Sequence, residues 1–370
     1  MAKQNKAYKF RLYPTKEQEL VIRKTFGCVR FVYNKMLAER KETYESLKDD
    51  KEELKKIKHP TPAKYKKGYE WLKEVDSLAL ANAQLNLDKA YKAFFKGNAK
   101  FPKFKNKRHK QSYTTNMVNG NIQLLDGHIK LPKLKMVKVK QHRKIPSEYQ
   151  LKSCTITMTA SGKYYISILV EYEKEIESKK IEKVVGLDFA MDGLFVDSAG
   201  EKANYPKFYQ QMLDKLAIEQ RKLSRKKKGS SNWNKQRIRV AKIGEKVANQ
   251  RKNFLHHKSK KLVTIYDAVV IEDLDMKGMS KALKFGKSVA DNGWGMFTTF
   301  LQYKLKEQGK QLIKIDKWYP STKICSNCGS VKEVKLSERI YQCTCGLCIN
   351  RDYNSAINIK KEGIRLLASA

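Results

Sequence analysis

The chain has 370 residues, and its 78 Lys and Arg outnumber its 38 Asp and Glu, which gives a formal net charge of +40. A charge of this size repels itself unless a polyanion neutralises it, so the composition indicates a nucleic-acid partner. Hydrophobic residues make up 41% of the chain, enough to form cores, so a wholly disordered protein is excluded. A membrane-surface protein is the rival class, but no signal peptide, lipidation motif or apolar run of about 20 residues is present. We expect no membrane partner.

The first half of the chain switches from helical to strand periodicity. Residues 7–13 alternate as a strand does, and residues 16–47 have helical spacing. A loop is expected over 48–67 and a second helix over 77–96. Residues 112–172 return to a period of two, which predicts a small barrel or twisted sheet. Because a single short strand is not stable, the opening strand is expected to pair with this sheet, and the helices form an insertion.

The second half predicts an α/β arrangement. Two mostly apolar strands, 184–189 and 268–273, each carry acids near their ends, and 194–197 follows the first at hairpin distance. The helical region 207–266 is interrupted at Gly229, which predicts two antiparallel helices. Further elements are expected as a helix at 297–308, a strand at 313–316 and a helix at 354–367.

Five of the seven cysteines lie between positions 325 and 348. Cys325 and Cys328 form a CxxC turn, and Cys343 and Cys345 form a tighter CxC turn. Four thiolates on two turns suit tetrahedral Zn²⁺, so we expect one structural zinc ion in a ribbon. A disulfide framework is the alternative, but clustered cysteines in a protein with no secretion signal favour a metal. Cys348 is expected to be a bystander or a spare ligand.

Three acids stand in positions suited to catalysis. Asp188 and Glu272 each follow an apolar strand, and Asp352 lies beside the start of the last predicted helix. Carboxylates at the ends of neighbouring strands converge at one edge of an α/β sheet. Three together require cations, and oxygen ligands suit two Mg²⁺ or Mn²⁺ ions. Such a pair supports in-line hydrolysis of a phosphodiester, as in a ribonuclease H-like nuclease core.

Other acids compete with these three. Because side chains alternate along a strand, Glu272 and Asp273 point to opposite faces, and only one of them can face the site. An acid at a strand end is also commonly a turn or cap residue. The remaining candidates are Asp192, Asp197, Asp275 and Asp291.

Several segments together resemble the TnpB family of transposon-encoded, RNA-guided DNA nucleases, which are related to the small type V CRISPR effectors. The matching segments are 8–15 (YKFRLYPT), 27–34 (GCVRFVYN), 101–105 (FPKFK), 185–188 (VGLD), 270–274 (VIEDL), 293–295 (GWG), 319–329 (YPSTKICSNCG) and 351–358 (RDYNSAIN). The resemblance runs nearly end to end. Asn350 stands where the family's usual Asp-Arg-Asp has its first acid.

The resemblance implies roles for individual residues. Asp188, Glu272 and Asp352 fall on the three catalytic positions of a RuvC-like domain, and the four clustered cysteines fall on the zinc ligands. It also implies two partners: a guide RNA derived from the right end of the transposon and a double-stranded target DNA. A monomer is expected in the ribonucleoprotein, located in the cytoplasm of a prokaryote and associated with the nucleoid.

The fold class implied is a multidomain α+β protein. Its parts are a β-barrel wedge domain (1–13 and 100–178), a helical recognition lobe (14–99), a RuvC-like (RNase H-like) α/β nuclease domain (179–317 and 351–370) and an inserted zinc ribbon (318–350). Base pairing reads most of the target in such proteins, so the protein needs mainly backbone contacts, which suit a Lys-rich surface.

Two further groups of residues are candidates for contacts with nucleic acid. In relatives, a short motif beside the target is read from regions that here hold Ser77, Ala81, Asn82 and Thr115, although each could equally cap a helix or face solvent. The basic loop Arg225, Lys226, Lys227 and Lys228 is interpreted as a backbone contact rather than a merely solvated charge run.

Two tryptophans near the ribbon could stack on unpaired bases or fill a core. We favour packing for Trp294 and leave both possibilities open for Trp318.

Three functions compete: an RNA-guided endonuclease, a DNA strand-transfer transposase, and a catalytically silent nucleic-acid-binding regulator of transposition. The complete acid triple favours the first.

Overall fold

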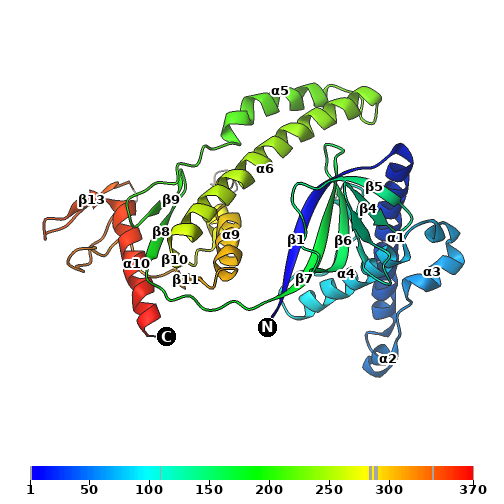
Figure 1. Cartoon of the computed structure of the whole chain (residues 1–370), viewed down its shortest axis with the longest axis horizontal. Helices are drawn as coiled ribbons and strands as arrows, with labels where there is room; N and C mark the ends of the chain where they lie inside the picture. Colours follow the sequence, from blue (N-terminus) through cyan, green and yellow to red (C-terminus); the bar gives the residue numbers. More distant parts are fainter. Residues whose placement is uncertain (1, 109, 283–285, 287–290, 336, 370) are drawn as a thin grey trace. The chain divides into compact units, whose positions relative to one another are not determined.

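The computed structural model describes residues 2–108, 110–282, 286, 291–335 and 337–369 (Figure 1). The chain divides into two compact units, Met1–Lys174 and Glu175–Ala370. Each unit has its own sheet and its own hydrophobic core. No helix among the described residues is both long enough and apolar enough to cross a membrane.

The first unit is built on a seven-stranded antiparallel sheet with the order β2-β6-β7-β1-β5-β4-β3. Its strands are β1 (Ala2–Tyr13), β2 (Gln111–Asn116), β3 (Gln123–Leu125), β4 (His128–Leu131), β5 (Lys135–Lys140), β6 (Gln150–Met158) and β7 (Tyr164–Lys174). The opening strand pairs with β7 along most of its length and with β5 at its end, so the expected pairing of this strand with the later sheet is confirmed.

The sheet is not closed into the barrel expected from the sequence. Its outer strands, β2 and β3, have no partner on their outer edges in the part of the chain that the structure describes. The strand β3 has only three residues, so it offers few backbone groups for a further pairing.

Helices of the first unit lie in the insertion between β1 and β2. They are α1 (Lys16–Leu47), α2 (Lys51–Lys56), α3 (Pro62–Gly68), the 3₁₀ turn η1 (Glu70–Glu74) and α4 (Ser77–Phe95). Thr15 begins α1 with a capping box, in which the side chains of Thr15 and Gln18 each accept a hydrogen bond from the other's backbone N–H. The loop expected over 48–67 is wrong in part, because α2 and α3 lie within it. Asp50 caps α2, and a proline starts α3, which are local signals for short helices.

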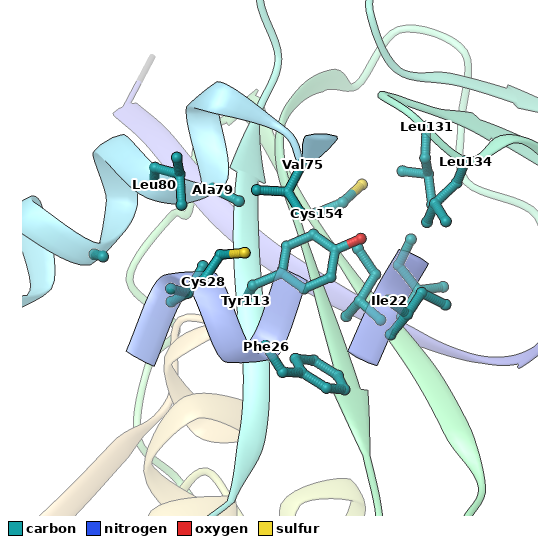
Figure 2. Packing of buried hydrophobic residues seen from close by; sticks show 14 of the residues in the cluster. Ile22, Phe26, Cys28, Val75, Ala79, Leu80, Tyr113, Leu131, Leu134 and Cys154 are labelled. Carbon is teal, nitrogen blue, oxygen red and sulfur yellow. The ribbon is translucent and has the colours of Figure 1, made fainter. Parts of the chain in front are cut away.

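The core of the first unit lies between α1, α4 and the sheet (Figure 2). Ile22 and Phe26 from α1 meet Tyr113 of the sheet, and Leu80 comes from α4. The two isolated cysteines, Cys28 and Cys154, belong to this core, and burial raises the pKa of Cys28 to about 11 and that of Cys154 to about 12. They are packing groups rather than reactive thiols.

The second unit has a four-stranded sheet with the order β11-β10-β8-β9. Its strands are β8 (Val184–Ala190), β9 (Leu194–Asp197), β10 (Ala268–Glu272) and β11 (Gln311–Ile315). Strand β8 is antiparallel to β9, whereas β8, β10 and β11 run parallel to one another. A separate two-stranded sheet joins β12 (Ile340–Gln342) and β13 (Cys348–Asn350).

Helices cover both faces of this sheet (Figure 1). The helices of the second unit are the 3₁₀ turn η2 (Gln210–Met212), α5 (Leu213–Ser224), α6 (Ser231–Ile265), α7 (Met276–Ala282), α9 (Trp294–Lys306) and α10 (Arg351–Ala368), of which α6, α9 and α10 pack on the sheet. One core packs α6 and α9 against the sheet, and Ile359 of α10 packs on Val270 from the other face. The pair α5–α6 confirms the two antiparallel helices predicted from the interruption at Gly229, which has a φ of +88°.

Helix α10 approaches the sheet so closely that two contact points require glycine. A Cβ on Gly186 in β8 would lie 2.5 Å from the backbone nitrogen of Lys360 and closer still to the carbonyl oxygen of Ala356. A Cβ on Gly363 would overlap the methyl groups of Val270. Neither the sheet nor α10 can move aside at small energetic cost, because each is held by its own backbone hydrogen bonds.

We expect Gly186→Ala to lower the free energy of unfolding of the second unit by about 2 kcal/mol, because the added methyl group overpacks the contact between β8 and α10. Urea denaturation followed by tryptophan fluorescence measures this change. Gly244→Ala in α6 is the matched control: nothing lies within 4 Å of its Cβ, and alanine should raise stability by about 0.5–1 kcal/mol. Equal effects of the two substitutions would contradict the close contact.

Candidate active site and four-cysteine metal centre

The parallel pairing of β8 and β10 places two of the predicted acids side by side. Leu187 pairs with Ile271, so the next residues, Asp188 and Glu272, occupy equivalent positions on neighbouring strands. Equivalent positions on paired strands point to the same face of a sheet. Both side chains face α10, since Asp188 accepts a hydrogen bond from Ser355 of that helix.

Burial and mutual repulsion dominate the electrostatics of this pair. Desolvation raises the pKa of Asp188 well above its ordinary value, the charge of Glu272 raises it further, and the hydrogen bond from Ser355 opposes the rise. Desolvation also raises the pKa of Glu272, against a hydrogen bond from Ser321. A buried carboxylate (Asp188) and a half-buried one (Glu272), both of which disfavour ionisation, form a site that gains from a bound cation.

The third acid, Asp352, lies in the first turn of α10. The predicted helix start at 354 is three residues late, because Asn350 caps the helix by accepting hydrogen bonds from the backbone N–H groups of Asp352 and Tyr353. The charge of Asp352 contributes to the raised pKa of Asp188, and its own carboxylate contacts the guanidinium of Arg351 at 3.3 Å. In the described part of the chain the three acids form no cluster as tight as that of the cysteines.

The competing acids have other partners. Asp273 is exposed and pairs with Lys314 at 2.8 Å, so of the two neighbours it is Glu272 that faces the other acid. Asp197 caps a turn through the backbone N–H groups of Ala199 and Glu201. Three acids remain: Asp291 pairs with Arg251, Asp192 pairs with Lys207, and Asp275 lies beside Gly278.

The four cysteines predicted as ligands are brought together. Cys325, Cys328, Cys343 and Cys345 have sulfur atoms that all lie within 4.8 Å of one another, and none is in a disulfide. The sulfurs of Cys325 and Cys345 are 3.6 Å apart, as are those of Cys328 and Cys343. Four sulfurs about 2.3 Å from a tetrahedral zinc ion would be about 3.8 Å apart, so the cluster fits zinc. Cys348 lies on β13, outside the cluster.

Both turns of the cluster use a glycine directly after the second cysteine. Gly329 and Gly346 have φ values of +79° and +88°, and each donates its N–H to the carbonyl of the first cysteine of its turn. The Ser330 hydroxyl lies 3.1 Å from the sulfurs of Cys328 and Cys343, and it lowers the pKa of Cys343 to about 5. A low thiol pKa favours the thiolate that a metal requires.

Sequence reasoning missed Ser321 and Ser355, whose hydroxyls contact Glu272 and Asp188. Ser321 and Ser355 are both buried, as are Asn354 and Asn358, which lie on α10 together with Ser355. A sequence signal was available for Ser355 alone. The polar residues at 354, 355 and 358 share one helical face with Ile359, and an apolar residue on a face indicates that the face is buried.

The residues proposed to contact nucleic acid differ in their exposure. Ser77 is exposed at the start of α4, whereas Ala81 and Asn82 are half-buried, and Asn82 donates to the carbonyl of Leu78. Thr115 is 1% exposed, so its hydroxyl is withdrawn from any ligand. The basic loop from Arg225 to Lys228 is largely exposed between α5 and α6.

The two tryptophans near the ribbon behave differently. Trp294 is buried against Phe189 and Phe297, which confirms packing. Trp318 is 80% exposed, with the Lys317 ammonium 5.0 Å from its ring centre.

Three family models match segments of the chain. Residues 167–283 match a model of OrfB of the IS605 type, described as "Probable transposase", and 294–359 match "Cas12f1-like, TNB domain". Residues 1–49 match a "Helix-turn-helix domain" model. In this chain that last segment forms strand β1 and the single helix α1, so no helix-turn-helix is seen there.

Curated relatives match along almost the whole chain. A protein of Streptomyces pristinaespiralis named "Putative RNA-guided DNA endonuclease" is 32% identical, with 98% of this chain and 90% of the relative covered. The Escherichia coli K12 protein "Putative RNA-guided DNA endonuclease InsQ" is 31% identical, with 99% and 94% covered.

A solved structure shares the fold. The protein in the cryo-EM structure of a Cas12f1–sgRNA–target DNA complex superposes with a TM-score of 0.61 at 12% identity, covering 97% of this chain and 99% of that one. This likeness shows a Cas12f1-like α+β fold. Together with the relatives, it confirms the resemblance seen in the motifs: the chain belongs to the OrfB/TnpB family.

The cysteine cluster predicts about one zinc ion per chain in freshly purified protein, measured by elemental mass spectrometry. Cys328→Ser should lose this zinc, because one of four thiolates is removed. Cys348→Ser is the matched control, since this thiol lies on the same ribbon but outside the cluster. Zinc-free wild-type protein, or equal loss in both variants, would rule out the assignment.

Proposed function

We propose that this protein is an RNA-guided endonuclease that cleaves double-stranded DNA at a single RuvC-like site. The observation that carries the proposal is the placement of Asp188 and Glu272 on adjacent parallel strands beneath the helix that bears Asp352. The names of the full-length relatives support the RNA-guided activity.

In this mechanism Asp188, Glu272 and Asp352 would hold two Mg²⁺ or Mn²⁺ ions. When bound, such ions activate the attacking water and stabilise the leaving 3′-oxygen of the phosphodiester. The chain's own residues do the rest. Asp188 and Glu272 present oxygens from a rigid sheet, and Asp352 adds a carboxylate from a helix N-terminus. Burial of Asp188 lowers the local dielectric constant, which strengthens charge interactions at the site.

The remaining parts of the chain serve the nucleic acids in this proposal. Four cysteine thiolates hold a structural zinc in the ribbon 318–350. The β domain (1–13 and 100–178) grips a guide RNA from the transposon's right end, and the helical lobe (14–99) lies along the guide–target duplex. Of the residues proposed to read the adjacent DNA motif, Ser77 is exposed, and Ala81 and Asn82 stand on the same helix. The exposed loop from Arg225 to Lys228 contacts phosphates.

DNA strand transfer is the second candidate, favoured by the description of the family model that matches residues 167–283. The same acids can support it, since the chemistry differs only in whether water or a DNA 3′-hydroxyl attacks. Incubation with a transposon-end substrate separates the two: joined products indicate transfer, and shortened products alone indicate hydrolysis. A silent regulator would give neither product.

We expect Asp188→Ala and Glu272→Gln each to reduce DNA cleavage by several orders of magnitude while leaving nucleic-acid binding intact, because a cation ligand is lost. Asp273→Asn is a closely matched control. It removes an acid next to Glu272 that is exposed and paired with Lys314, so cleavage should remain near the wild-type rate. Gel assays of cleavage and binding test this, and cleavage retained by Asp188→Ala would overturn the site.

Protein purified from cells that carry its native flanking DNA should retain one discrete RNA species ending in a variable, guide-like segment. RNA sequencing of the purified complex identifies it, and the guide then gives a target for the cleavage assay. Heterogeneous RNA with no enriched species would mean that the protein, through its net charge of +40, binds nucleic acid without selecting a particular RNA.

A further inference from the structure

Two buried serine hydroxyls join the carboxylates of Asp188 and Glu272. The Ser355 hydroxyl donates to Asp188 Oδ1 at 2.9 Å, and the Ser321 hydroxyl donates to Glu272 Oε1 at 2.6 Å. The two serine oxygens are 3.0 Å apart, a contact between two hydroxyls whose single hydrogens both go to the carboxylates. Ser321 is 3% exposed and Ser355 is fully buried, so this bridge is shielded from water. The bridge uses one oxygen of each carboxylate and leaves the second oxygen for a cation.

The two serines come from different parts of the second unit. Ser355 lies on α10, one turn after Asp352. Ser321 precedes the first cysteine turn, which begins at Cys325. The bridge therefore connects the strand acids to the helix that carries the third acid and to the segment that enters the metal centre.

Two buried asparagines fix the position of Ser321. Asn358 donates to the carbonyls of Ser321 and Ile324 at 2.8 and 2.6 Å. Asn354 donates to the Ile324 carbonyl at 2.7 Å and accepts from the Ser326 N–H at 2.9 Å. The backbone from Ser321 to Ser326 is thus held on α10 at both ends, and the Ser321 hydroxyl has a defined position relative to Ser355.

A fixed hydroxyl changes what a carboxylate can do for a cation. A carboxylate without a partner can rotate about its terminal torsion, whereas a hydrogen bond to one oxygen sets the direction of the other. Removing such an outer partner of a metal ligand typically weakens metal binding 10–100-fold. Neither serine needs to touch the cation for this effect.

We propose that Ser321 and Ser355 are positioning residues, which orient Glu272 and Asp188 for divalent-cation binding. This inference rests on the proposed function, because it takes the two acids as cation ligands. The serines act through the carboxylates, and α10 sets their spacing through Asn354 and Asn358.

The test measures Mn²⁺ binding to the purified, zinc-loaded protein without nucleic acid, by electron paramagnetic resonance of the free ion. Ser321→Ala and Ser355→Ala should each weaken Mn²⁺ binding about 10–100-fold, while the zinc content stays at the wild-type level. Ser321→Thr keeps a hydroxyl, and it should restore most of the affinity lost in the alanine variant.

A matched control separates positioning from general loss of stability. Ser259 is also fully buried, and its hydroxyl donates to the carbonyl of Leu255 within α6, away from the acids. Ser259→Ala should lower the thermal midpoint to a similar degree as the other two alanine variants, yet leave Mn²⁺ binding unchanged. If all three variants weaken Mn²⁺ binding alike, the serines are merely structural and the inference fails.

Variants of the acids distinguish a failure of this inference from a failure of the proposed function. Asp188→Ala and Glu272→Gln should abolish the Mn²⁺ binding that the serines tune. If both acid variants bind Mn²⁺ as wild type does, the proposed cation site itself is wrong. If the acid variants lose binding but Ser321→Ala and Ser355→Ala retain full affinity, the site stands and the positioning role of the serines is refuted.

Discussion

The close approach of α10 to the sheet is the constraint on which the second unit depends. Because Gly186 has no Cβ, the helix backbone at Ala356 and Lys360 can lie directly on β8. This approach places Asp352 near the strand acids and brings Ser355 within hydrogen-bond distance of Asp188. A helix displaced by the width of one methyl group would lose both arrangements, since a hydrogen bond of 2.9 Å does not survive a shift of that size.

The buried face of α10 is partly polar, and its hydrogen bonds fix the position of the helix relative to its neighbours. Apolar contacts alone would let a helix slide or rotate on a sheet at small cost. Asn354 and Asn358 instead make hydrogen bonds to particular backbone groups of the segment before the cysteines, and buried polar groups are costly to leave without partners. The segment that leads into the four-cysteine cluster and the acids are therefore linked through one helix face.

Local signals in the sequence were sufficient for much of this fold. Apolar periodicity located α1 and α4, the interruption at Gly229 separated α5 from α6, and the CxxC and CxC turns identified the four-cysteine cluster. The strand period showed that only one of Glu272 and Asp273 could face the site, and the structure has Glu272 beside Asp188 while Asp273 is paired with Lys314. The open edges of the first sheet and the serine bridge could not be predicted, because they depend on contacts between residues far apart in the chain. Ser321 and Ser355 lie 34 residues apart, and serine is mostly found on the surface, so residue type alone does not predict that these two are buried.

The order in which the three acids occur along the chain has a consequence for synthesis on the ribosome. Residues 1–174 form a unit with its own core, so this unit can fold while later residues are still being added. Strands β8 and β10, which carry Asp188 and Glu272, emerge next, before the helix α10 that covers their face in the complete fold. The acids can meet only after residue 352 has left the exit tunnel. A nascent chain is therefore a folded, positively charged protein for some time before it has a complete acidic site.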